Sequence, residues 1–155
     1  MTTTTTREVR PSYFATYDYN ELTGQVDVHY WYRSQRGKRA GKILPWPPRR
    51  SHFGVLYSKD IPADLTGEAR DRWAQCWFNE MHVIRLSALR EIEDRPDECA
   101  ASFARLRACC CCCGKALDEP RSVAYGIGPE CRTGMPPAML TKISAIVARD
   151  RAASA

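Results

Sequence analysis

The chain has 155 residues, of which 44% are hydrophobic and 26% are charged, and its formal net charge is +5. This length and composition are typical of one globular domain, and they exclude a multi-domain assembly and a fully disordered chain. A membrane-spanning helix needs about 18 consecutive uncharged apolar residues, and no such run occurs. The threonine tract after Met1 does not have the pattern of a secretion signal. We therefore expect a cytoplasmic protein with no membrane partner.

The N-terminal third of the chain has the composition of a small β-sheet. Residues 1–10 contain a threonine tract with nothing to bury and are expected to form a disordered tail. From Tyr13 to Tyr32, aromatic and β-branched residues lie on both sides of a Leu-Thr-Gly turn at 22–24, which predicts a β-hairpin. A further short strand is predicted at residues 51–57.

Residues 33–50 form a basic segment that carries seven positive side chains and no acidic one. Arginine and lysine bind phosphates, and exposed aromatic rings stack on bases, so this segment is a candidate nucleic-acid-binding surface. The alternative interpretation is a solvated loop whose aromatic residues point into the core. The candidate contacts are Arg33, Arg36, Lys38, Arg39, Lys42, Trp46, Arg49 and Arg50.

After residue 63 the hydrophobic pattern changes from a strand period to a helical one. Residues 66–93 are predicted to form one long amphipathic helix, Pro96 begins a second helix, and Pro136-Pro137 precedes a last one. The expected fold class is α+β, with an N-terminal antiparallel sheet, the long helix and a C-terminal zinc-knuckle lobe flanked by helices. In this interpretation residues 11–107 form an α+β domain and residues 108–155 form the lobe. The apolar stripe of the long helix contains Trp73, Cys76, Trp77, Met81, Ile84, Ala88 and Ile92.

Eight cysteines are many for a chain without an export signal, and in a reducing compartment clustered cysteines are metal ligands more often than disulfides. Cys110 and Cys113 have CxxC spacing, and Gly114 can adopt the positive φ that a zinc knuckle requires after its second cysteine. Cys131 follows 18 positions after Cys113 and could return a third thiolate to the same ion. Zinc is the expected metal, and iron remains an alternative. The competing interpretation is that the run of cysteines is simply an apolar, buried patch.

A closed structural zinc site needs a fourth ligand. We expect Cys99, on the predicted second helix, to supply it if that helix packs against the knuckle. The alternative for Cys99 is a core position beside Phe103. The other candidates for the fourth ligand are Cys109, Cys76 and His82.

The segment from Cys110 to Cys131 reads CCCCGKALDEPRSVAYGIGPEC. It resembles a small uncharacterised cysteine-motif domain of bacterial and phage proteins, whose usual pattern is CxxCGRxLxxPxSxxxGIGPxC. Lys115 stands where that family usually has arginine, which keeps the charge and loses the planar guanidinium. The resemblance implies zinc binding, sometimes beside nucleic-acid-handling regions, and implies no demonstrated reaction.

The chain has no P-loop, HExxH, GxSxG or zinc-deaminase motif, so an enzyme is the less favoured interpretation, and no small-molecule substrate is evident. We therefore expect a non-enzymatic zinc-binding protein that contacts nucleic acid through the basic segment and its aromatic residues. The alternative is a protein-interaction module of phage origin, in which the long helix binds a host protein and zinc is purely structural.

Overall fold

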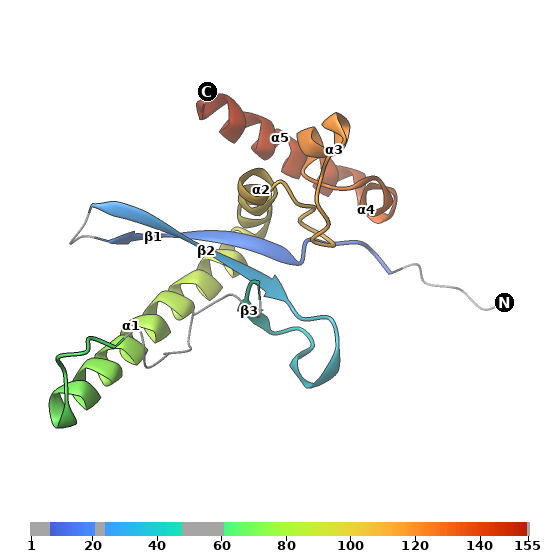
Figure 1. Cartoon of the computed structure of the whole chain (residues 1–155). Helices are drawn as coiled ribbons and strands as arrows, with labels where there is room; N and C mark the ends of the chain where they lie inside the picture. The colour runs from blue at the N-terminus through green and yellow to red at the C-terminus, as the bar shows by residue number, and fades with distance from the viewer. Residues whose placement is uncertain (1–6, 21–23, 48–60, 155) are drawn as a thin grey trace.

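The computed structural model describes residues 7–20, 24–47 and 61–154 (Figure 1). It has the expected α+β class, with a small antiparallel sheet near the N-terminus, one long helix and several C-terminal helices. The elements in chain order are β1 (Tyr13–Asn20), β2 (Gln25–Arg33), the 3₁₀ turn η1 (Gly37–Arg39), β3 (Ile43–Pro45), α1 (Gly67–Asp94), α2 (Pro96–Arg107), α3 (Pro120–Tyr125), α4 (Pro129–Gly134) and α5 (Pro137–Ala153).

The sheet has the strand order β1-β2-β3, and both pairs are antiparallel. The predicted hairpin is confirmed, with Tyr13 opposite Tyr32 at one end and Asn20 opposite Gln25 at the other. The third strand lies inside the basic segment, where the sequence analysis predicted no strand. The strand predicted at residues 51–57 falls outside the described residues.

The three predicted helices are confirmed. Thr66 is the N-cap of α1 but makes no side-chain cap hydrogen bond, whereas α2 and α5 each have proline in the first turn. Proline fits there because the first N–H groups of a helix have no partner within the helix. Among the helices that the structure describes, none is long and apolar enough to cross a bilayer.

The end of the hairpin away from its turn is buried, and aromatic side chains connect it to α2. Tyr13 and Trp46 both lie with their ring centroids 5.2 Å from that of Phe103 on α2. Trp31 is fully buried, and its indole N–H donates to Thr16 Oγ1 over 2.8 Å. In the view of Figure 1, α1 runs below the sheet while α2 to α5 lie above it. The core is therefore built around the crossing of the sheet and α2.

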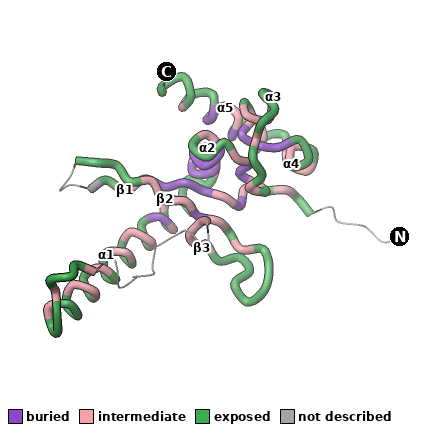
Figure 2. Tube along the Cα trace, in the orientation of Figure 1, coloured by how far each residue is buried: buried purple, intermediate pink, exposed green. Residues whose placement is uncertain are grey.

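Helix α1 is buried only near its C-terminal end. Ala88 and Ile92 are buried there, whereas Phe78, Val83 and Leu86 are exposed. Figure 2 shows the first turns of α1 exposed or half-buried, and buried positions appear only where the helix approaches the sheet. The apolar periodicity was a correct indicator of the helix but overstated how much of it is buried.

The C-terminal lobe is attached to the sheet through backbone hydrogen bonds. The carbonyl oxygen of Cys111 accepts from the N–H groups of both Ser12 and Tyr13, each over 2.9 Å. The Val9 N–H donates to the Gly134 carbonyl over 3.0 Å, so the described end of the predicted tail is tied down. Of that tail, residues 1–6 lie outside the described part of the chain.

Candidate metal centre

The backbone around the consecutive cysteines forms a tight turn. The Cys110 N–H donates to the Lys115 carbonyl, the Gly114 N–H donates to the Cys110 carbonyl, and both bonds are 2.8 Å long. Gly114 has a φ of +76°, which a residue with a side chain rarely adopts. This turn puts the side chains of Cys110 and Cys113 on the same side of the loop, as the CxxCG spacing predicted.

The third cysteine returns through the Gly-Ile-Gly-Pro segment. Gly126 ends α3 with a φ of +71°, and its carbonyl accepts from the Cys111 N–H over 3.2 Å. Ile127, within this connection, is fully buried. Helix α4 then begins at Pro129 and carries Cys131 toward the turn.

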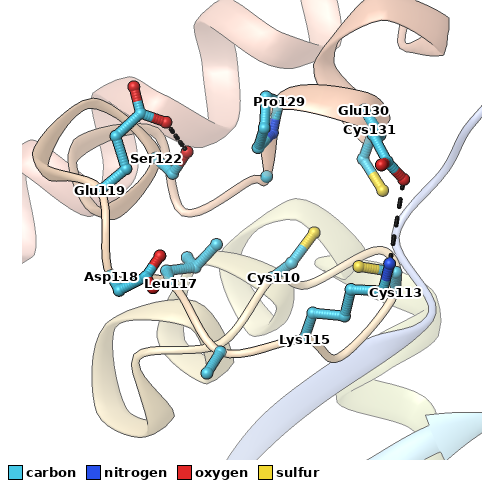
Figure 3. Close-up of a pocket in the computed structure, with 12 residues that line it drawn as sticks. Cys110, Cys113, Lys115, Leu117, Asp118, Glu119, Ser122, Pro129, Glu130 and Cys131 are labelled. Atoms are coloured by element: carbon cyan, nitrogen blue, oxygen red, sulfur yellow. Dashed lines mark hydrogen bonds and ion pairs between the residues drawn. The ribbon is translucent and has the colours of Figure 1, made fainter.

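The sulfurs of Cys110, Cys113 and Cys131 all lie within 4.8 Å of one another (Figure 3). Tetrahedral zinc with Zn–S bonds of about 2.3 Å requires sulfurs about 3.8 Å apart, which this arrangement approaches. Cys110 is buried, Cys131 is half-buried and Cys113 is exposed. Three cysteines from two separate segments could therefore hold one metal ion, and three sulfur donors suit zinc or iron.

The electrostatics of the three sulfurs fit a cation. The pKa of Cys110 is lowered to about 4. The largest cause is a hydrogen bond from the Cys112 thiol to the Cys110 sulfur, and the backbone N–H groups of Gly128, Cys113 and Cys112 add to it. The pKa values of Cys113 and Cys131 are raised, mainly by burial and also by the negative charge of Cys110. A cation between the sulfurs would reverse this repulsion and favour all three thiolates.

A half-buried arginine, Arg132, which the sequence analysis did not single out, braces the loop beside Cys131. The Arg132 guanidinium donates to Ser122 Oγ over 2.9 Å and to the Ile127 carbonyl over 2.8 Å. It also stacks 5.1 Å from the centre of the Tyr125 ring. Its place next to Cys131 and ten residues after Ser122 was the only sequence signal available. Outer contacts of this kind orient the residues that bind a metal.

Cys99 lies elsewhere, because α2 directs its side chain toward the end of α1. It is buried, its sulfur lies 3.8 Å from the Glu91 carbonyl oxygen, and burial raises its pKa to about 12. Cys99 is therefore not among the converging sulfurs. It occupies a core position, which was the alternative interpretation. The Cys109 thiol donates a hydrogen bond to the Arg107 carbonyl oxygen. Cys76 and His82 are exposed on α1. Within the described residues, no fourth His, Cys, Asp or Glu joins the group.

In the described part of the basic segment, the cationic residues are exposed, whereas the Trp46 ring is packed against the core. The side chains of Arg33, Arg36, Lys38, Arg39 and Lys42 belong to exposed residues, and Arg49 and Arg50 lie outside the described residues. The Trp46 ring packs on Phe103, and the Arg107 guanidinium lies 5.1 Å over it. Trp46 therefore belongs to the packed aromatic cluster, as the alternative interpretation of this segment had it.

Comparison with known proteins matches only the stretch from the middle of α2 to the residue before α5. Residues 100–136 match a family of unknown function, DUF6011, and this stretch contains Cys110, Cys113 and Cys131. No curated protein matches the chain. No solved structure matches it either. The segment that builds the candidate metal centre is thus similar to an uncharacterised family.

Proposed function

We propose that Cys110, Cys113 and Cys131 bind one zinc ion that holds the C-terminal lobe in shape, in a protein that acts by binding rather than by catalysis. The observation that carries this proposal is the convergence of three sulfurs from two turns separated by 18 residues. Zinc suits thiolate donors and tetrahedral geometry, and a bound ion contributes directly to the folding free energy of a small lobe.

Metal content and thiol accessibility test the zinc proposal. The purified, reduced protein should contain one zinc ion per chain, and chelation should increase the number of thiols that react with a thiol reagent by three. Cys131→Ser should lose the zinc, whereas Cys76→Ser, which changes an exposed cysteine on α1, should keep it. Equal zinc content in the two variants would contradict the proposal, and iron in place of zinc would correct the metal.

We further infer that the exposed cations of the basic segment contact nucleic acid. Among the described residues, no carboxylate forms an ion pair with Arg36, Lys38, Arg39 or Lys42. Arg7 adds a cation beside them, because its Nη2 lies 3.4 Å from Gln35 Oε1. Since the Trp46 ring packs on Phe103, the contacts of this segment would be mainly to phosphates, and sequence preference would be weak.

Salt dependence tests the nucleic-acid proposal. Affinity for a short DNA duplex should fall steeply with salt, and Lys38→Glu with Arg39→Glu should weaken binding and reduce the log–log slope by roughly two, since each phosphate contact contributes about 0.9. Arg70→Glu with Arg72→Glu makes the same charge change at the start of α1, which Figure 1 shows far from η1, and should have a much smaller effect. Equal effects of the two pairs would argue against a defined surface. Salt-insensitive binding of a protein partner through α1 would favour the alternative function.

A further inference from the structure

A cavity of about 200 Å³ lies directly beside the three sulfurs, and Cys110, Cys113 and Cys131 all line it. Leu117, Gly128 and Pro129 contribute apolar wall, as Figure 3 shows for the two labelled side chains. Cys113 is exposed and Cys131 is half-buried, and because all three cysteines line the cavity, a small molecule in it can reach their sulfurs. A ligand that joined the ion from outside would enter through this cavity.

The charges around the cavity select the kind of ligand. A divalent ion with three thiolates has one net negative charge. The wall of the cavity carries one positive side chain, Lys115. It carries three negative side chains: Asp118, Glu119 and Glu130. Lys115 lies 3.9 Å from Glu130, and neighbouring Arg132 lies 4.0 Å from Glu119, so both cations are already opposed by carboxylates. The excess negative charge would repel an anionic ligand, whereas a neutral donor would not be repelled.

We propose, on the basis of the zinc site proposed above, that its fourth position is open to this cavity and takes a neutral nitrogen donor, an imidazole ring, in exchange for water. Three cysteines and one histidine are a common tetrahedral zinc set, and three protein ligands alone leave a position free. The apolar wall of Leu117 and Pro129 suits the faces of a flat ring. His29 and His82, which the structure describes, lie on β2 and α1 and do not join the group.

Among the described residues, Cys112 is the competitor for the fourth position. Its backbone N–H donates a hydrogen bond to the Cys110 sulfur, with 3.4 Å between nitrogen and sulfur, and its thiol is also hydrogen-bonded to that sulfur. It is half-buried and does not belong to the group of converging sulfurs. A change of its side-chain rotamer could nevertheless close the site with a fourth thiolate, so the experiment must separate the two arrangements.

Cobalt(II) serves as the probe, because it occupies tetrahedral zinc sites and has visible absorption bands. The reduced, metal-free full-length chain is loaded with one equivalent of cobalt(II) and titrated with imidazole and, in parallel, with azide. Imidazole should shift the visible bands saturably while the thiolate-to-cobalt charge-transfer band remains. Azide should require a higher concentration, and Asp118→Asn should lower the azide half-saturation concentration without changing that of imidazole.

The outcomes separate this inference from the zinc proposal. If cobalt gives no thiolate charge-transfer band, the metal site itself is wrong. If the band appears but imidazole leaves the visible spectrum unchanged, the fourth position is closed and only this inference fails. Cys112→Ser should keep the full charge-transfer intensity, as Cys76→Ser does; loss of intensity in Cys112→Ser alone would identify Cys112 as the fourth ligand and overturn the inference.

Discussion

Gly114 is the residue on which the shape of the cysteine turn depends most directly. Its φ is +76°, and a Cβ atom added there would lie 2.7 Å from Cζ of Tyr13. The Tyr13 ring cannot easily retreat, because it packs on Phe103 at 5.2 Å between centroids. The turn therefore needs glycine for its backbone conformation and also for the space that Tyr13 occupies.

Gly114→Ala should destabilise the protein more than Gly41→Ala. Gly41 has a similar φ of +83° but nothing within 4 Å of its added Cβ, so alanine there should cost only the backbone strain of about 1–2 kcal/mol. At Gly114 the contact with Tyr13 should add about 1–3 kcal/mol. Urea unfolding of the reduced, metal-loaded variants measures both costs. Equal costs would mean that Tyr13 moves aside freely.

Arg132→Ala should also be strongly destabilising. The Arg132 side chain is only 13% exposed, and its loss leaves the carbonyl of buried Ile127 without that donor. Removing a charged hydrogen-bond partner from a buried group costs about 1.5–3 kcal/mol. Arg121→Ala is the control, since Arg121 is exposed and lies 5.9 Å from the same Tyr125 ring; we expect it to cost below about 1 kcal/mol. Similar unfolding midpoints for the two variants would refute the bracing role.

At the scale of the element, α1 is one continuous helix with two different environments. Ile92 is 2% exposed, whereas Val83 is 65% exposed on the same helix. Ile92→Ala should therefore lower the free energy of unfolding by about 2–5 kcal/mol. Val83→Ala should change it by less than about 0.5 kcal/mol. A large cost for Val83→Ala in denaturant unfolding would show that its face is covered in solution.

At the scale of the whole molecule, the metal lobe and the sheet share contacts. The Cys111 carbonyl accepts from two N–H groups at the start of β1, and the core includes Phe14 together with Ile127 and Ile143. We therefore expect the lobe and the sheet to unfold together. If the lobe proposed at residues 108–155 were independent, two separate transitions would appear.

Metal removal should destabilise the whole chain. Chelation of zinc should lower the single thermal midpoint, because a ligand present at 1,000 times its dissociation constant stabilises the folded state by about 4 kcal/mol. Cys131→Ser should begin at the lower midpoint and not respond to the chelator, while Cys76→Ser should behave like the original protein. Differential scanning calorimetry under reducing conditions makes the measurement. An unchanged midpoint in the original protein would contradict a structural role for the ion.

Much of the architecture was readable from local patterns along the chain. The hairpin, α1, α2 and α5 were all predicted, because alternation, helical periodicity and the initiating prolines act within a few residues. The strand β3 was missed because its pairing with β2 depends on where the chain returns after η1. The packing of Trp46 on Phe103 joins residues more than fifty positions apart, and no local pattern encodes it.

The candidate site divides in the same way. The CxxCG spacing and the Gly-Ile-Gly-Pro return were enough to group Cys110, Cys113 and Cys131, because short turns with glycine have few conformations. The direction of the Cys99 side chain depends on how α2 is rotated about its axis. The packing of α2 against β1 and α5 fixes that rotation. The cavity, its excess of carboxylates and the brace from Arg132 are all built within residues 110–132, but they exist only once the turns of this segment have folded onto one another. Spacing can name which atoms are able to meet, but the free energy of burying the remaining side chains selects which of them do.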